Sequence, residues 1–389
     1  DLTPFHWELE YPDVFAHEGF DVVVANPPFI GDRLLKSRFG SDDLVNFLAC
    51  YYILDDGKPE YAGFFFWRYH HITNSAGVVG SLASNSIAQA SNRVYVTKPL
   101  TQGLGISPFT LFRVIPNREW PSEANVHFAA VFMARTFKGV AHLVIDKKVR
   151  PVSHNYGISS YFDLYPDYDL HELKSSRETK AYKGMIYGGE VFERPLDFLS
   201  DVPESEKDAM SIRVRSTDIQ KKFPIQIDTC VFDLEECLYL NEKEELDPKK
   251  RDKWLRENRP FVYKELKNEV SSFDWSKSSY TCDPDKWYEF HRSRKELRSK
   301  WKNLSRVVVQ GVVTKVWAPQ FMPKIDKTHN IAYSFTNSVY VFPTEDNYKF
   351  AIFSSLLFEM ITRRQSSSLE TRLRFTSKNV FPYFPWPWT

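Results

Sequence analysis

The feature that most constrains the fold is the run F-D-V-V-V-A from Phe20 to Ala25. It lies between Gly19 and the sequence Asn26-Pro27-Pro28, and those prolines end a strand because proline lacks a backbone donor and fixes φ. A β-branched run bounded in this way is typical of a strand that is buried on both faces. Such strands occur in parallel sheets covered by helices, so we expect one here.

The segments that follow alternate between helix and strand patterns. Residues 63–72 form an apolar stretch of helical length, and strand-like runs follow at 77–83 and 126–134. This alternation up to about residue 150 predicts an α/β fold, with part of a doubly wound, Rossmann-like sheet.

A different pattern begins after about residue 185. Short strand-like pieces at 211–214, 231–232, 306–313, 331–334 and 338–342 are interrupted by charged and aromatic stretches, and residues 348–364 have helical length. We expect a mixed α+β second domain. The predicted domains are 1–184, 185–345, and a carboxyl-terminal helix with a Pro/aromatic tail, 346–389, packed on the second domain.

Composition excludes several classes of protein. Lys and Arg number 51 against 50 Asp and Glu, so attraction to a polyanion must come from local clusters of charge. No apolar run approaches the roughly 18–20 residues that span a bilayer, so we expect no membrane contact. Four cysteines are too few for a disulfide framework, which favours a cytoplasmic protein. The chain begins with Asp1 rather than Met, so we expect a processed protein or a piece of a longer one.

The residues Asn26-Pro27-Pro28-Phe29 follow the first predicted strand directly, where α/β sheets bind ligands. The Asn side chain and the prolyl carbonyls offer hydrogen-bond acceptors, and Phe29 offers a flat apolar face. Together they suit a planar heterocycle that carries an NH2 group, with both of its hydrogens accepted and its ring stacked. The alternative is a simple turn that ends a strand.

The run from Phe20 to Phe29 resembles the catalytic motif of amino-group DNA methyltransferases, which methylate the exocyclic nitrogen of adenine. The resemblance extends to residues 6–15 (H-W-E-L-E-Y-P-D-V-F), 26–33 (N-P-P-F-I-G-D-R), 84–89 (S-N-S-I-A-Q), 124–128 (A-N-V-H-F) and 369–387. It is closest to large enzymes that fuse methyltransferase and target-recognition functions in restriction-modification and phage-defence (DISARM-like) systems. It covers most of the chain and implies a prokaryotic source.

The resemblance implies roles for individual residues. Asn26 and the Pro27 carbonyl would accept the amino hydrogens, Pro28 would shape the turn, and Phe29 would stack on an adenine rotated out of the duplex. Trp120 sits where the family has a second aromatic surface, although an ordinary half-buried Trp explains it equally well. Asn85 and Gln89 are candidates to line the same pocket, but a polar cap on the following helix is an equal explanation.

The chain departs from the family in the cofactor region. These enzymes bind S-adenosylmethionine through a glycine-rich turn and an acidic residue that precede the N-P-P-F strand. In this chain, Gly19 is the only glycine before Asn26. Gly103-Leu104-Gly105 lacks a preceding strand and a complete G-x-G-x-x-G, so we interpret it as a loop. We therefore expect S-adenosylmethionine as the methyl donor, with its main binding residues outside this chain, and no metal.

Residues 249–302 contain sixteen Lys or Arg against nine Asp or Glu, interleaved with aromatic residues. Such a pattern suits DNA, with cations for phosphates and Arg forks for guanine. The candidate DNA-binding residues are Arg256, Arg259, Arg292, Arg294, Arg298 and Lys315. The alternative for part of this segment is an amphipathic helix over about 285–302, with its charges in water and Trp287, Phe290, Leu297 and Trp301 in a core.

The sequence as a whole predicts a site-specific DNA adenine-N6 methyltransferase that acts on double-stranded DNA. Its further partners would be the missing amino-terminal part of the same polypeptide or other subunits of a defence system. Two alternatives remain: a non-catalytic DNA-binding or specificity module that works with a separate cofactor-binding chain, and a methyltransferase for a glutamine amide or an RNA base.

Overall fold

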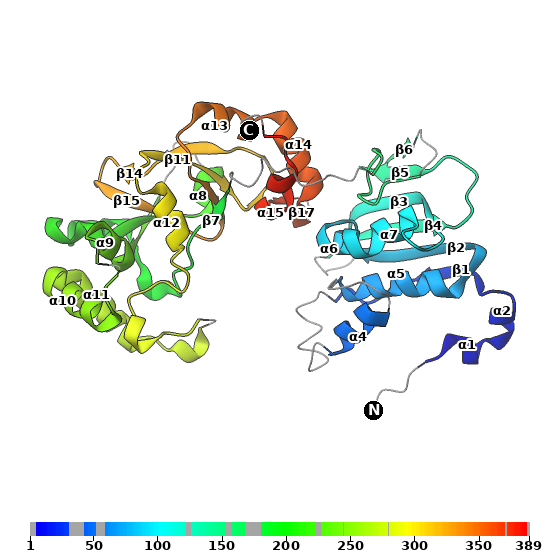
Figure 1. Ribbon diagram of the computed structural model, residues 1–389, viewed down its shortest axis with the longest axis horizontal. Coiled ribbons are helices and arrows are strands. Elements are labelled where there is room, and N and C mark those ends of the chain that lie inside the picture. The colour runs from blue at the N-terminus through cyan, green and yellow to red at the C-terminus, as the bar shows by residue number, and fades with distance from the viewer. Residues whose placement is uncertain are drawn as a thin grey trace. The chain divides into compact units, whose positions relative to one another are not determined.

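A computed structural model of the chain describes residues 5–30, 43–51, 59–121, 126–152, 157–167, 180–221, 227–243, 245–278, 280–369 and 372–386. The chain forms two compact units (Figure 1). The first unit is Asp1–His171 with Arg364–Thr371, and the second is Glu172–Arg363 with Arg372–Thr389. The predicted bounds are 184/185 and 345/346, whereas the units divide at 171/172 and residues 364–371 belong to the first unit.

The first unit is built on a six-stranded sheet in the order β1-β2-β4-β3-β5-β6. The strands are β1 (Phe20–Ala25), β2 (Thr73–Ser84), β3 (Thr110–Glu119), β4 (His127–Ala134), β5 (His142–Ile145) and β6 (Lys148–Pro151). The pairs β1/β2 and β3/β5 are parallel, and the other three pairs are antiparallel. The predicted α/β class is confirmed, with a sheet that is mixed rather than wholly parallel.

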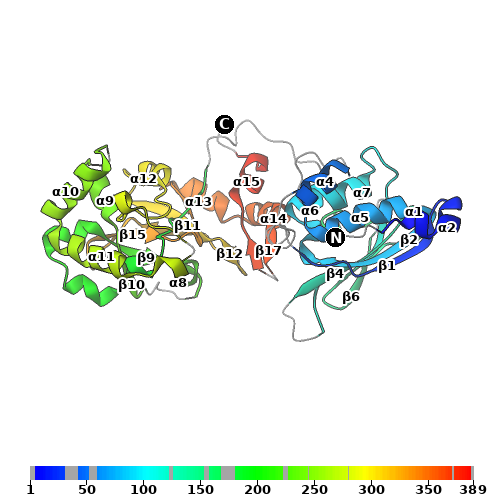
Figure 2. The same ribbon diagram turned by 90° about the horizontal axis from the view of Figure 1, so that it is seen from below.

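Helices cover one face of this sheet, as Figure 2 shows for α4 to α7. The elements outside the sheet are α1 (Trp7–Glu10), α2 (Pro12–Ala16), α4 (Asp43–Tyr51), α5 (Tyr61–Ile72), the 3-10 helix η1 (Asn85–Ala88), α6 (Ala90–Asn92), the π-helix η2 (Arg93–Thr97), α7 (Lys98–Gln102) and β17 (Ser367–Leu369). The core under α5 joins Phe66 to the sheet residues Val79, Ala83 and Val131.

Strand β1 is an edge of the sheet rather than a buried strand. Val23 and Ala25 pack against the core, but Val22 is 62% exposed and Val24 is 84% exposed. The expectation of burial on both faces is therefore wrong for this chain. The reason is that only β2 pairs with β1 among the described strands, and nothing described covers the face that carries Val22 and Val24.

The second unit contains two further sheets. The five-stranded sheet has the order β14 (Ile325–Asp326), β15 (Ile331–Phe335), β9 (Met210–Val214), β10 (Thr229–Phe232), β8 (Glu193–Pro195). The four-stranded sheet has the order β13 (Gln320–Pro323), β11 (Arg306–Gly311), β16 (Val339–Phe342), β7 (Tyr182–Lys183). The short strands β12 (Val313–Thr314) and β18 (Arg372–Arg374) pair with each other.

The longer helices after residue 180 are α8 (Ser216–Lys221), α9 (Leu234–Leu240), α10 (Pro248–Asn258), α11 (Pro260–Ser272), α12 (Lys295–Trp301), α13 (Asn347–Phe353), α14 (Leu356–Gln365) and α15 (Ser377–Val380). The aromatic tail packs in the second unit, where Phe381 and Trp386 share a core with Phe342. No helix in the described ranges is long and apolar enough to cross a membrane.

Two predicted helices are shorter than expected. The helix expected over about 285–302 begins only at Lys295, but Trp287, Phe290, Leu297 and Trp301 are all buried as predicted. The helix expected over 348–364 is divided into α13 and α14 at Ser354 and Ser355.

Candidate functional site

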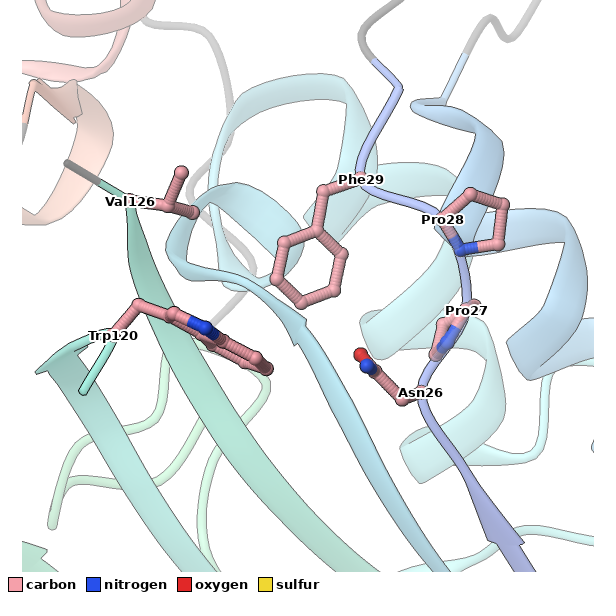
Figure 3. A pocket seen from close by; sticks show the side chains of 6 residues that line it. All are labelled: Asn26, Pro27, Pro28, Phe29, Trp120 and Val126. Carbon is pink, nitrogen blue, oxygen red and sulfur yellow. The ribbon is translucent and has the colours of Figure 1, made fainter. Parts of the chain in front are cut away.

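A pocket of about 280 Å³ lies at the carboxyl end of β1. Asn26, Pro27, Pro28 and Phe29 form one wall, and Trp120 and Val126, at the ends of β3 and β4, form the other. Figure 3 shows the Asn26 side chain pointing into the space between the Phe29 and Trp120 rings. The volume lies just below the range of about 300–1,000 Å³ that is usual for small-molecule sites, so it suits a single planar group.

The two predicted acceptors in this pocket are the Asn26 side-chain oxygen and the Pro27 carbonyl. Asn26 is exposed and Pro27 is buried. Among the residues that the structure describes, no donor bonds to the Asn26 amide oxygen or to the Pro27 carbonyl. The Pro28 carbonyl, by contrast, accepts the Ile30 N–H at 3.1 Å, and the Ile30 carbonyl accepts the Tyr61 N–H at 3.0 Å. The loop is thus fastened to α5 while its two acceptors stay open.

The two aromatic walls are perpendicular. The Phe29 and Trp120 ring centroids are 6.4 Å apart with an interplanar angle of 88°. Trp120 also meets Phe128 edge-on at 5.3 Å, and its backbone N–H donates to the Val126 carbonyl at 2.9 Å. One flat ligand can therefore stack on one ring and meet the edge of the other, but it would stack on both only after a ring rotation.

Asn85 and Gln89 do not line this pocket. The Gln89 amide donates to the Ser368 hydroxyl at 2.7 Å and accepts the Ser368 N–H at 2.7 Å. The Asn85 amide oxygen accepts the Asn117 N–H at 3.0 Å, and the Asn117 oxygen contacts the His127 ring nitrogen Nδ1 at 3.0 Å. Gln89 therefore binds the carboxyl-terminal segment of the first unit. Asn85 binds the β3–β4 hairpin that carries Trp120.

A buried carboxylate beside this loop was missed by the sequence analysis. Glu60, the residue before α5, accepts hydrogen bonds from the Ser84 hydroxyl at 2.7 Å and the Ser86 hydroxyl at 2.9 Å. Its backbone N–H donates to the Asn92 oxygen at 2.7 Å. Burial raises the pKa of Glu60, and the two serine hydroxyls oppose that shift. The only sequence signal was a glutamate just before an apolar helix.

The predicted DNA-binding cations have different environments. Arg256, Arg292 and Lys315 are exposed. Arg259 forms an ion pair with Asp208 at 2.5 Å and is mostly buried.

Arg298 is 3% exposed, which removes it from the candidate DNA contacts. It forms buried ion pairs with Asp233 at 2.9 Å and with Glu236. The expectation is wrong here because α12 turns Leu297, Arg298 and Trp301 towards the core.

The described residues do not form a recognisable site for S-adenosylmethionine. Gly103 ends α7 in a left-handed conformation with φ of 69°, and neither it nor Gly105 follows a strand. A glycine-rich cofactor turn needs a strand before it and a helix after it, so this loop does not fit the cofactor. The described part of the chain also holds no cluster of three or more His, Cys, Asp or Glu that could bind a metal.

Comparisons with known proteins agree with the fold and the motif. Residues 1–98 match the family of Eco57I restriction-modification methylases. The chain is similar to the type IIL restriction-modification enzyme MmeI, solved in complex with DNA, with a TM-score of 0.64 and 15% identity over 97% of this chain and 48% of that one. No curated protein matches the sequence.

Two further structures match with lower TM-scores. They are a DrdV–DNA complex (TM-score 0.40, 10% identity, 97% of this chain and 44% of that one) and the type IIG restriction endonuclease BpuSI (TM-score 0.30, 11% identity, 93% and 46%). The chain thus spans about half the length of the solved structures that it matches. The resemblance to restriction-modification methylases is confirmed for residues 1–98.

Proposed function

We propose that this chain is the target-base and DNA-recognition part of a site-specific adenine-N6 DNA methyltransferase from a restriction-modification or phage-defence system. The observation that carries the proposal is the pocket of Asn26, Pro27, Phe29 and Trp120, in which two unpaired acceptors face an apolar aromatic wall. An adenine has the complementary features, which are an exocyclic NH2 with two hydrogens and a flat ring.

The Asn26 amide oxygen and the Pro27 carbonyl would each accept one amino hydrogen. Holding both hydrogens fixes the NH2 group and raises the electron density on its nitrogen, which prepares that nitrogen to attack a methyl donor. Phe29 would stack on the base, a contact worth about 1–3 kcal/mol. These contacts help to offset the few kcal/mol that are needed to rotate a base out of the duplex.

The methyl donor belongs to the proposal, but its site does not lie in the described residues. S-adenosylmethionine is the donor that the motif implies, whereas Gly103 and Gly105 do not fit it. We infer that a cofactor-binding half, on another segment or another chain, pairs with the free edge of β1 beside Asn26. The same half would also cover the face of β1 on which Val22 and Val24 are exposed.

There is one alternative to this proposal. In it, the chain is a non-catalytic specificity module that holds a base and DNA for a separate enzyme. The two proposals differ in whether Asn26 takes part in the transfer step.

Replacing Asn26 tests the proposal in an enzyme that contains this chain and the cofactor-binding half. We expect Asn26→Ala to lower kcat by about 10²–10³-fold, the usual loss when one preorganised hydrogen-bonding group is removed. Asn26→Asp keeps an acceptor oxygen and should retain more activity than the Ala variant. The readout is N6-methyladenine in duplex DNA, measured by mass spectrometry. Full methylation by Asn26→Ala would leave only the specificity-module alternative.

A further inference from the structure

The second unit holds four cationic side chains from separate segments close together, which we call the cation cluster: Lys183 on β7, Arg292 and Arg294 before α12, and Arg374 on β18. Two of these residues, Lys183 and Arg374, had no assigned role. None of the four has a carboxylate within ion-pair distance in the part of the chain that the structure describes. The exposed Arg292 and Arg374 leave the cluster open to solvent.

Backbone pairing holds the cluster together. The N–H and C=O of Arg292 bond to the C=O and N–H of Ile186 at 3.0 and 3.1 Å, and the Arg294 Nε donates to the Gly184 carbonyl at 3.2 Å. Gly184 is itself packed tightly against the end of β15, because a Cβ there would lie 2.2 Å from the Phe335 carbonyl oxygen.

The buried Tyr340 connects the remaining members. Lys183 is paired with Tyr340 in the sheet, and its Nζ lies 5.7 Å from the centre of the Tyr340 ring. The same ring contacts Phe375, the neighbour of Arg374, at 4.8 Å. The backbone segments that carry the four cations are therefore held in place by the fold.

This arrangement is costly without an anion. Burial lowers the pKa of Lys183, and repulsion from Arg374 and Arg294 lowers it further. Burial and then repulsion from Arg292 lower the pKa of Arg294. Arg294 also has a left-handed backbone with φ of 55°, a conformation that is strained for a non-glycine residue. Strain and unpaired like charges at one place are typical of a binding site.

We propose that the cation cluster of Lys183, Arg292, Arg294 and Arg374 binds the phosphodiester backbone of double-stranded DNA. The inference rests on the proposed function, and it identifies which surface of the second unit meets the backbone. Arginine forks match phosphate oxygens in a bidentate manner, and the Nη groups of Arg294 stay available while its Nε is held by Gly184. Because phosphate contacts carry no sequence information, the cluster would set affinity and register rather than specificity.

The salt dependence of DNA binding tests the cluster in the full chain. We expect Arg292→Gln and Arg374→Gln each to reduce the slope of log K against log salt by about 0.9, measured by fluorescence anisotropy between about 50 and 200 mM salt. Both side chains are exposed, so these variants should fold, and thermal unfolding checks that they do. Affinity should fall equally for target and non-target duplexes.

A matched control is Lys253→Gln on α10, an exposed lysine that is paired with Glu257 at 3.9 Å. It removes the same charge but should leave the slope unchanged. If the unaltered chain binds DNA and both arginine variants keep its slope, the cluster is not the phosphate site, although the proposed function stands. If the unaltered chain binds no duplex DNA even at about 50 mM salt, the proposed function fails and the cluster assignment fails with it.

Discussion

Glu235 on α9 is a buried carboxyl group in the core of the second unit. Burial raises its pKa to about 7 from an ordinary value of 4.5; nearby Asp233 adds to the rise, while Arg298 opposes it. The group therefore stays protonated in the folded protein at a pH where the unfolded chain has already ionised.

This shift predicts that Glu235 reduces stability as the pH rises. Below 4.5 the carboxyl is protonated in both states and costs nothing. Between 4.5 and about 7 only the unfolded state releases its proton, so the free energy of unfolding falls, in total by about 3 kcal/mol. Glu235→Gln should therefore stabilise the protein more at about pH 8 than at about pH 5, measured by urea unfolding.

Glu257→Gln is the control for this measurement. Glu257 is an exposed glutamate on α10 of the same unit, so its replacement should shift stability by less than about 0.5 kcal/mol at both pH values. A gain for Glu235→Gln that is equal at both pH values would contradict the raised pKa.

At the residue scale, the structure brings together residues that the sequence analysis assigned to one site after the first strand. Asn26 to Phe29 and Trp120 meet in one pocket, because the carboxyl end of β1 and the β3–β4 hairpin lie at the same end of the sheet's strands. The expectation for Arg298 was wrong, because basic and aromatic residues alternate there and the sequence does not reveal which arginine has Asp233 as its partner.

At the element scale, the residue after β2 supports the strand that carries Trp120 into the pocket. Asn85 follows β2 directly and bonds to the N–H of Asn117, which lies in a bulge of β3 with φ of 53°. That bulge carries the strand end to Trp120. The Asn85 side chain thus supplies the hydrogen bond that the bulge removes from the β3–β4 pairing, and it helps to fix the position of Trp120.

Removing the Asn85 acceptor should loosen the hairpin. Asn85→Ala leaves the half-buried Asn117 N–H without this acceptor. The cost is below the about 1–3 kcal/mol of a fully buried unpaired donor, because water can reach part of the group. We expect faster amide hydrogen exchange for residues 115–121, measured by mass spectrometry. Asn85→Asp keeps the oxygen that accepts this bond and should restore slow exchange. Unchanged exchange in Asn85→Ala would show that Asn85 does not hold Trp120.

Helix boundaries also show the limits of the sequence. A single helix over 348–364 would place Phe350, Phe353, Leu357 and Ile361 on one apolar face, yet Leu357 is 55% exposed and Phe358 is fully buried. The break at Ser354 and Ser355 shifts the register of α14 relative to α13. Helical periodicity cannot reveal such a shift, because tertiary packing determines which face is buried.

At the scale of the whole molecule, the first unit is assembled from two distant segments of chain. Residues 364–371 return to it after the second unit, and Gln89 holds Ser368 there through two hydrogen bonds. No periodicity or composition marks this return, which is why the sequence predicted three consecutive domains. Polar pairs between distant segments become visible only in the fold.

The face of β1 that carries Val22 and Val24, which no described segment covers, is the second feature at this scale. Val24 is 84% exposed on a strand that otherwise has the composition of a sheet interior. If a cofactor-binding half covers this face, a charge introduced there would be harmless in the chain alone and harmful in the assembled enzyme.

Val24→Lys should therefore change the stability of this chain by less than about 0.5 kcal/mol, measured by urea unfolding. In an enzyme that also contains the cofactor-binding half, it should lower methyl transfer at least about tenfold, because burying an unpaired charge costs several kcal/mol. Val149→Lys is the matched control, since Val149 is 56% exposed on β6, the opposite edge of the same sheet, and should be neutral in both tests. Methyl transfer that survives Val24→Lys undiminished would mean that the cofactor-binding half lies elsewhere.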